Sequence, residues 1–253
     1  MITVLVTSSS YLLLAGVPLC MGMAWILYKY RSRNVEKLVL DVKTQQALRR
    51  YVLLESVHGK PDSVLLTYKE YAKRNRQIER LIFTEEQELF FADAIKNSRP
   101  ITALLLGTQC GYSAIQLLAR IPPNGKVYAV EQNEILAESA EEMILVSGFK
   151  NHQFAMLFQP PLEAIIALVK RFDLQKVDLV LMDQQPIQYL ENFLALEKEG
   201  ILHPGTLILV NHIEQSTAKA FMDYLQSYPH RIMGRCQGLV LIQCVGERES
   251  RLQ

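Results

Sequence analysis

The sequence predicts an α/β fold with a mostly parallel, doubly wound sheet, preceded by one N-terminal transmembrane helix. Beyond residue 100, short apolar runs alternate with amphipathic helical stretches, which is typical of a parallel sheet covered by helices on both faces. A turn with two glycines follows the first of these runs, as in nucleotide-binding α/β folds. The first 28 residues carry no charge, and a helix of about 20 apolar residues spans a bilayer.

The composition is that of a globular protein. The chain has 253 residues, 49% of them hydrophobic, enough for one domain or one domain with a small appendage. With 27 basic and 26 acidic residues the formal net charge is +1, which argues against a nucleic-acid-binding protein. Four scattered cysteines favour ordinary reduced thiols over a disulfide framework or zinc ribbon.

The N-terminal segment, residues 1–33, is predicted to be a membrane anchor with a basic flank. Residues 11–28 are apolar, and Trp25 lies near the end that Lys29, Arg31 and Arg33 follow. Basic residues mark the cytoplasmic side of a membrane helix, so the main domain is expected to face the cytoplasm. A cleaved signal peptide is the alternative; it would need a basic residue before the apolar run, so we favour an uncleaved anchor.

The remaining chain, 34–253, is predicted to form one domain whose first part, 34–99, is helical. The expected helices span residues 34–51, 61–71 and 84–97. The last begins with a capping box, Thr84 to Gln87. The charged stretch 69–80 is expected to be a solvated helix face or connector; a lipid-headgroup patch is the second choice because Glu70 and Glu79 dilute its charge.

The α/β part is expected to begin at residue 101. Strands are expected at residues 101–106, 126–131, 152–158, 177–183, 206–211 and 238–245. Helices are expected at residues 112–120, 135–147, 162–171, 187–199 and 216–226. Ligands of such sheets bind beyond the carboxyl ends of the strands, so the residues at those ends are the candidates for function.

The first two strand ends indicate a nucleoside-type ligand. Gly107 and Gly111 allow the backbone to turn and approach a ligand. Glu131 ends the second strand about 20 residues later, where a carboxylate can accept both hydroxyls of a ribose. These residues alone do not distinguish NAD from S-adenosylmethionine. The loop is not a Gly-x-Gly-x-x-Gly, and the sequence contains neither a Walker loop nor a Tyr-x-x-x-Lys pair.

The fourth and fifth strand ends indicate a metal site. Asp183 ends the fourth strand, and Asn211 and His212 end the fifth. Oxygen and nitrogen ligands that converge there can hold a divalent cation. The alternative is that Asn211 and His212 are hydrogen-bonded loop residues.

Four motifs together resemble catechol O-methyltransferase. They are Leu-Gly-Thr-Gln-Cys-Gly-Tyr-Ser from Leu106, Val-Glu-Gln-Asn from Val130, Leu-Met-Asp from Leu181 with Tyr189-Leu190, and Gly-Thr-Leu-Ile-Leu-Val-Asn-His from Gly205. The resemblance spans roughly residues 47–245. The N-terminal anchor resembles that of the membrane form and of the related transmembrane O-methyltransferases.

The resemblance implies a Rossmann-like domain that binds S-adenosylmethionine and methylates a catechol hydroxyl with Mg²⁺. It implies cofactor contacts for four residues: Gly107, Tyr112, Ser113 and Glu131. It implies metal contacts for Asp183, Asn211 and His212, although Asn211 stands where the family has Asp and His212 where it has Asn. It also makes the endoplasmic reticulum the expected membrane. It names no protein partner.

Other positions depart from the family pattern. This chain has Leu105 where the family has an acidic residue, Gln109 where it has Tyr, Pro161-Leu162 where it has Ser-Gln, Gln184-Gln185 where it has His-Trp, and Pro186 where it has the catalytic Lys. Its loop at residues 233–238 is short and lacks the family's Glu. Without that Lys, His212 is a hypothetical general base. The competing hypothesis is a non-catalytic, membrane-tethered protein that keeps the fold for binding partners. An NAD enzyme is a poorer third reading.

Overall fold

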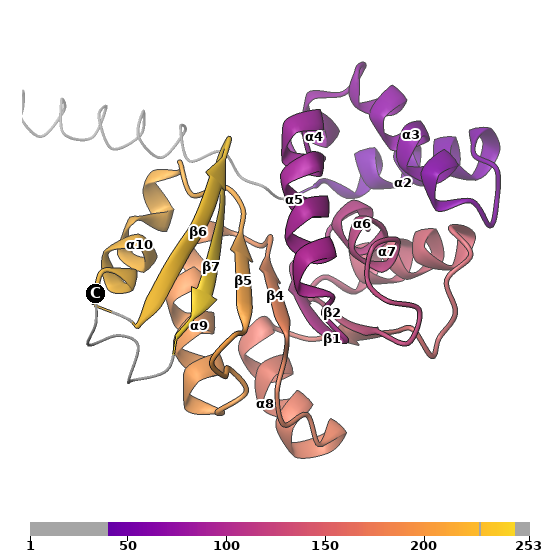
Figure 1. The fold of residues 1–253 in the computed structure, drawn as a ribbon. Coiled ribbons are helices and arrows are strands. Elements are labelled where there is room, and N and C mark those ends of the chain that lie inside the picture. Colours follow the sequence, from indigo (N-terminus) through magenta and orange to yellow (C-terminus); the bar gives the residue numbers. More distant parts are fainter. Residues whose placement is uncertain (1–39, 228, 246–253) are drawn as a thin grey trace, which may run out of the picture. The chain divides into compact units, whose positions relative to one another are not determined.

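The computed structural model describes residues 40–227 and 229–245 (Figure 1). All of them belong to one compact unit. The predicted anchor, residues 1–33, lies outside the described residues. Within the two described ranges, no helix is long and apolar enough to cross a membrane.

The described residues form one seven-stranded sheet in the order β3-β2-β1-β4-β5-β7-β6. The strands are β1 (Thr102–Leu106), β2 (Lys126–Glu131), β3 (Phe154–Phe158), β4 (Leu179–Met182), β5 (Leu207–Val210), β6 (His230–Cys236) and β7 (Leu239–Cys244). Strands β1 to β5 are parallel, and β7 runs antiparallel to both β5 and β6. The predicted Rossmann-like, mostly parallel sheet is therefore confirmed.

Strand β6 was not predicted from the sequence. Its residues are exposed or half-buried, because it is an edge strand that pairs with β7 alone. An edge strand needs no continuous apolar run, so the pattern that marks the inner strands is missing here.

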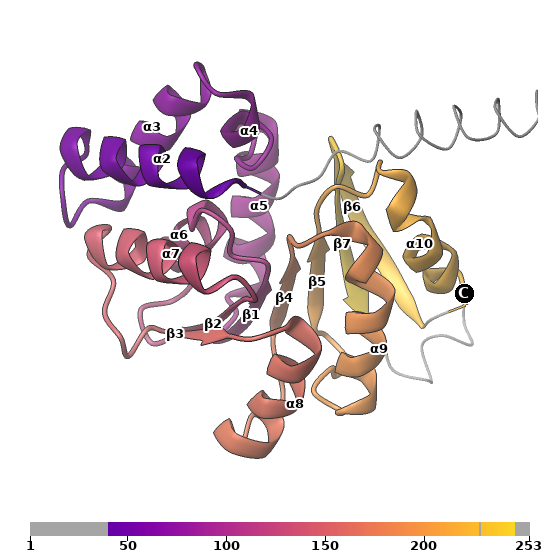
Figure 2. The ribbon, with the colours of Figure 1, turned by 180° about the vertical axis from the view of Figure 1, so that it is seen from behind.

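Helices cover both faces of the sheet. They are α2 (Val42–Glu55), α3 (Pro61–Ala72), α4 (Arg76–Glu79), α5 (Glu85–Ser98), α6 (Tyr112–Leu118), α7 (Glu134–Val146), α8 (Pro161–Phe172), α9 (Tyr189–Lys198) and α10 (Lys219–Leu225), with short 3-10 turns η1 (Pro186–Gln188) and η2 (Ser216–Ala218). Helices α2 to α7 lie on one face and α8 to α10 on the other (Figures 1 and 2).

Alternation along the strands builds two cores. Leu105 and Leu181 pack against the layer that contains α2 to α7. Leu104 and Val180, one residue away, pack against α8 to α10. Successive side chains of a strand point to opposite faces, so a strand covered on both faces must be apolar throughout.

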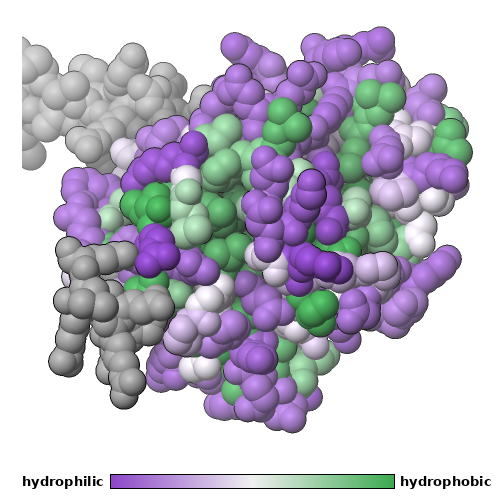
Figure 3. Space-filling model, in the orientation of Figure 1, coloured by the Kyte–Doolittle hydropathy of each residue, from purple (hydrophilic) through white to green (hydrophobic). Residues whose placement is uncertain are grey.

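The charged connector 69–80 is better packed than its composition indicates. Asn75 caps the short helix α4 by accepting hydrogen bonds from two backbone N–H groups, and Ile78 is fully buried in the core. The face of the molecule in Figure 3 is mostly hydrophilic, with groups of apolar residues between polar ones.

The register of the sheet positions the candidate site. Leu106 is paired with Val130 on one side and with Met182 on the other, and Met182 is paired with Val210. The residues that follow these four, Gly107, Glu131, Asp183 and Asn211, therefore form one row at the carboxyl edge of the sheet.

Candidate active site at the carboxyl edge of the sheet

A pocket lies at this edge, with about 560 Å³ of empty space when the open solvent at its mouth is included. Its walls are Leu40, Gly107, Gln109, Val130, Glu131, Gln132, Asn133, Leu136, Pro161, Gln184, Gln185 and Gln188. Two of the four predicted cofactor residues, Gly107 and Glu131, are in this wall. Concave sites with a few convergent polar groups are the usual place for small ligands.

Glu131 is held rigidly in the pocket wall. One carboxylate oxygen accepts a hydrogen bond from the backbone N–H of Gln109 at 2.9 Å, and the other accepts one from the N–H of Asn133 at 3.0 Å. Each carboxylate oxygen has a second lone pair. The fixed carboxylate can therefore still accept a pair of hydroxyl donors.

Gly107 is required where β1 turns into the loop. Its φ is +90°, and a Cβ there would lie 2.6 Å from the backbone N and Cα of Gln184. Both the conformation and the crowding demand glycine. The close approach of the two backbones brings the loop after β1 against the end of β4.

The side chains of Tyr112 and Ser113, the other two predicted cofactor residues, point elsewhere. The Tyr112 ring is fully buried against Tyr68 and Phe83, and its hydroxyl donates to Glu88. The Ser113 hydroxyl donates to Asp183. Both side chains therefore stabilise the protein interior instead of lining the pocket, and their predicted cofactor contacts stay predictions.

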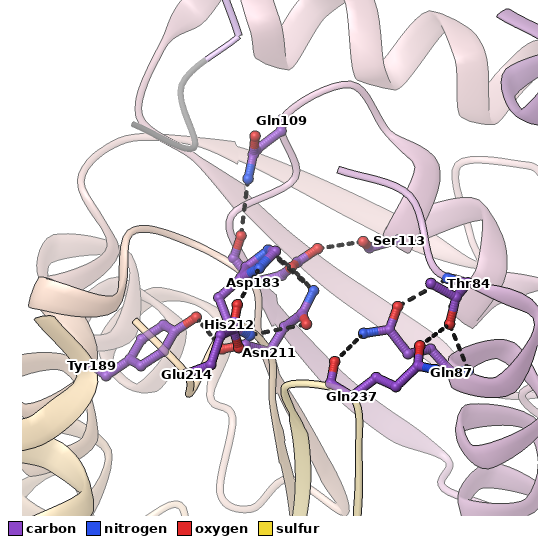
Figure 4. A network of polar contacts seen from close by, with 10 residues as sticks. All are labelled: Thr84, Gln87, Gln109, Ser113, Asp183, Tyr189, Asn211, His212, Glu214 and Gln237. Atoms are coloured by element: carbon purple, nitrogen blue, oxygen red, sulfur yellow. Dashed lines mark hydrogen bonds and ion pairs between the residues drawn. The ribbon is translucent and has the colours of Figure 1, made fainter. Parts of the chain in front are cut away.

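Asp183, Asn211 and His212, the predicted metal ligands, do come together next to the pocket (Figure 4). One oxygen of Asp183 accepts from Ser113, and the other accepts from the amide nitrogen of Asn211 at 2.9 Å. The amide oxygen of Asn211 accepts the backbone N–H of His212 at 2.9 Å. The three residues thus satisfy one another.

His212 lies between two carboxylates. Its Nε2 is 3.6 Å from Asp183 Oδ1, and its Nδ1 is 3.9 Å from Glu214 Oε1. Burial lowers the pKa of His212 to about 4, so the imidazole is neutral near pH 7 and these contacts are not ion pairs. His212 also has a φ of +54°, a left-handed conformation that is uncommon for non-glycine residues.

Burial raises the pKa of the Asp183 carboxyl to about 6, while the hydrogen bonds from Ser113 and Asn211 act in the opposite direction. A carboxyl and an imidazole with perturbed pKa values, adjacent at the edge of a pocket, are typical of active sites.

The donor set does not fit a hard divalent cation. Mg²⁺ prefers several oxygen ligands in octahedral geometry, yet both Asp183 oxygens accept hydrogen bonds and Asn211 turns its N–H₂ group toward them. Among the residues that the structure describes, no group of three His, Cys, Asp or Glu side chains could hold a metal ion. The predicted metal role of Asp183, Asn211 and His212 stays a prediction.

The β6–β7 turn borders this cluster. Ile213 N–H donates to the carbonyl of Gly238, and a Cβ on Gly238 would lie 2.3 Å from Glu214. On its other side the turn is tied to α5, since the backbone carbonyl of Gln237 accepts from Gln87 and its side-chain oxygen accepts from Thr84 (Figure 4). The predicted 233–238 loop is thus mostly strand, since residues 233–236 belong to β6, and the remaining turn of Gln237 and Gly238 is a fixed wall beside Glu214.

Sequence reasoning treated Gln109, Gln184 and Gln185 as departures from a family pattern and did not predict them as site residues. All three line the pocket. Their positions within two residues of Gly107 and Asp183 were a usable signal, because strand ends carry the site in such sheets. Pro186, in place of the family's Lys, is buried at the start of η1.

A protein-family model described as O-methyltransferase matches residues 57–212. The transmembrane O-methyltransferase of Homo sapiens is 26% identical over 230 residues, which cover 87% of this chain and 78% of the relative. The catechol O-methyltransferase of Mus musculus is 27% identical over 225 residues, which cover 87% of this chain and 83% of the relative.

Solved structures support the fold. A SAH-bound methyltransferase of Podospora anserina superposes with a TM-score of 0.63 at 15% identity, over 82% of this chain and 97% of that one. The O-methyltransferase TomG of Streptomyces achromogenes has a TM-score of 0.58 at 19% identity, over 71% and 89%. The family model covers most of the α/β sheet and the whole row of strand-end residues, so this chain belongs to the O-methyltransferase family.

Proposed function

We propose that this protein is an S-adenosylmethionine-dependent O-methyltransferase that methylates a catechol-type hydroxyl. Membership of the family and relatives named catechol O-methyltransferase support the reaction class. The observation that carries the proposal is the fixed Glu131 carboxylate in a pocket that ends beside the buried Asp183–Asn211–His212 cluster.

The chain's own residues would bind and orient the two reactants. S-adenosylmethionine supplies, when bound, a sulfonium methyl group to which an oxygen nucleophile can bond, with the neutral thioether as the leaving group. Glu131 accepts the ribose hydroxyls, and Gly107 lets the backbone come close to the ligand. Holding donor and acceptor in line removes much of the entropic barrier of a bimolecular step.

His212 is proposed to take the proton of the acceptor hydroxyl. Its neutral imidazole is 12% exposed, whereas Asp183 beside it is almost fully buried. Unprotonated Nε2 accepts from the Asn211 amide nitrogen at 3.2 Å; when it gains the proton it must turn to the Asp183 carboxylate instead, while Glu214 faces Nδ1, and the two carboxylates stabilise the charge. The proton then passes to solvent. No step is assigned to a metal, because the donor set does not fit one.

The test is methyl transfer from labelled S-adenosylmethionine to a catechol by the full chain in detergent, with His212→Ala and the exposed His58→Ala as a pair. We expect His212→Ala to lose at least about 100-fold in turnover, the usual contribution of a general base, with unchanged affinity for S-adenosylmethionine. Retained turnover in His212→Ala would exclude it as the base.

A second candidate function is a non-catalytic, membrane-tethered binding protein. It is favoured by the buried Pro186, which cannot act as a base where the family has Lys, and by the hydrogen bonds that already occupy both oxygens of Asp183. Binding of S-adenosylmethionine without methylation of any catechol would support this candidate over the enzyme.

Residues 1–33 are proposed to anchor the protein in the endoplasmic reticulum membrane by a single pass, with residues 34–253 as the cytoplasmic domain. Relatives named transmembrane O-methyltransferase support this. We expect alkaline carbonate to leave the full chain in the membrane pellet and to release a chain that lacks residues 1–33. Release of both would contradict the anchor.

A further inference from the structure

Two buried glutamines in the pocket wall carry polar atoms without a partner. Gln184 is 6% exposed, and neither its Nε2 nor its Oε1 has a hydrogen-bond partner among the described residues. Gln109 is 9% exposed; its Nε2 donates to the carbonyl of Asp183 at 3.1 Å, while its Oε1 has none there. Figure 4 shows that amide oxygen turned away from Asp183.

These atoms point to a ligand. Buried amide groups without partners destabilise a fold, so native proteins keep few of them, commonly for a functional reason. The two glutamines are adjacent, because the Gln109 amide contacts the peptide unit that leads into Gln184. Both residues belong to the wall of the same pocket.

The charge of the wall restricts the ligand chemistry. Of the described residues that line the pocket, Glu131 is acidic and none is Lys, Arg or His. With the full negative charge of Glu131 and no basic side chain in the wall, the pocket favours a cation over a phosphate group, and the amide oxygens can face that cation.

The row at the carboxyl edge fixes which cation this is. In sheet order the row runs from Glu131 to the loop after Gly107, then to Asp183 and finally to Asn211. If the ribose is at Glu131 and the acceptor hydroxyl at His212, the sulfur between them must pass Gln109 and Gln184.

We propose that Gln109 and Gln184 hold the sulfonium of S-adenosylmethionine and make the pocket prefer it to the demethylated, uncharged thioether S-adenosylhomocysteine. This inference rests on the proposed function. When the acceptor oxygen bonds to the methyl carbon, the carbon–sulfur bond electrons return to sulfur and its positive charge disappears. The amide oxygens then lose their attraction for the product, which favours its release.

The experiment compares the Kd values of the two ligands by calorimetry, with the full chain in detergent. Both ligands carry the same adenosine, ammonium and carboxylate groups, so their ratio isolates the sulfonium charge. The variants are Gln184→Leu and Gln184→Glu. The control is Gln188→Leu, a half-buried residue of the same wall.

For Gln184→Leu we expect about tenfold weaker binding of S-adenosylmethionine, in line with the loss of one polar contact to a charged group, and less than about twofold for S-adenosylhomocysteine. Gln184→Glu should raise the preference for the sulfonium, and it keeps the side-chain shape if Gln184→Leu fails to fold. Gln188→Leu should leave the ratio unchanged.

Equal weakening of both ligands by Gln184→Leu would indicate a merely structural role and overturn the inference, as would an unchanged ratio in Gln184→Glu. In either case the proposed function survives, because the wild-type chain still binds. If the wild-type chain binds neither ligand at millimolar concentration while folded, the proposed function fails and this inference fails with it.

Discussion

His212 and Asp183 are adjacent, yet burial shifts their pKa values in opposite directions. The folded-state pKa of His212 falls to about 4 from its usual 6.5, and that of Asp183 rises to about 6 from 3.8. Between pH 4 and 6.5 the unfolded chain binds more protons at His212, so the His212 contribution to stability falls as the pH falls. At Asp183 the folded chain binds more protons, so that contribution falls as the pH rises. The two effects offset each other in the wild-type chain.

Replacing His212 by Gln removes one of these opposing effects. Relative to wild type, His212→Gln should gain roughly 3 kcal/mol in the free energy of unfolding between pH 7 and pH 4. Urea denaturation at both pH values measures it, and the exposed His58→Gln is the control. If the free energy of unfolding of His212→Gln differs from that of wild type by the same amount at pH 4 and at pH 7, the imidazole of His212 is not buried in its neutral form.

Gly107 and Gly205 show two different reasons why a position requires glycine, namely steric crowding and backbone conformation. Both have positive φ, +90° and +99°, but a Cβ on Gly107 meets the Gln184 backbone at 2.6 Å, whereas one on Gly205 meets nothing within 4 Å. Gly205→Ala should cost about 1 kcal/mol for backbone strain. Gly107→Ala should cost about 3 kcal/mol or more, because crowding is added to strain. Equal losses in thermal or urea unfolding would show that the loop relaxes freely.

At the scale of elements, the site depends on how the β6–β7 hairpin is attached. Thr84 and Gln87 form the capping box of α5, and both also bond to Gln237 in the β6–β7 turn. One local motif therefore stabilises a helix start and also holds the turn that crowds Glu214 through Gly238.

Thr84→Ala should lower the free energy of unfolding by about 1–2 kcal/mol, since it removes a cap hydrogen bond and the contact with Gln237. Thr84→Ser keeps the hydroxyl and should cost much less. Chemical denaturation compares the two. If both variants lose the same amount, the methyl group and not the hydroxyl matters, and the turn is not held as described.

At the scale of the whole molecule, two layers of helices enclose the sheet and leave its carboxyl edge for ligands. A ligand that binds the native state raises the melting temperature by mass action. S-adenosylmethionine should therefore stabilise the full chain, while Mg²⁺ should not, because Asn211 presents N–H₂ to the carboxylate that a metal would need.

The matched variant is Asn211→Asp, which adds a carboxylate directly beside that of Asp183. At about 10 mM Mg²⁺ we expect no rise in the wild-type melting temperature and a rise of a few degrees in Asn211→Asp, as two adjacent carboxylates bind a hard cation far better than one. Stabilisation of the wild-type chain by Mg²⁺ would restore the metal role predicted for Asp183, Asn211 and His212.

The local pattern of the sequence was enough to predict the sheet, the covering helices and the ends of the inner strands. Apolar runs such as residues 101–106, and the capping box at Thr84, are local patterns that predict the structure of the residues directly around them. The places of Gly107 and Glu131 at the strand ends were predictable for the same reason, because a turn glycine and a strand-end carboxylate have local signatures; their cofactor contacts stay predictions.

The tertiary structure decided which of these polar groups meet. Ser113 and Asp183 are 70 residues apart and Asn211 is 28 residues beyond Asp183, so no local signal shows that they satisfy one another. The inward direction of Tyr112 and the pairing of the edge strand β6 also depend on distant segments. The burial of Gln109 and Gln184 also depends on distant segments. A glutamine in a sequence gives no sign of function, because only packing removes water from its amide and leaves that amide without a partner.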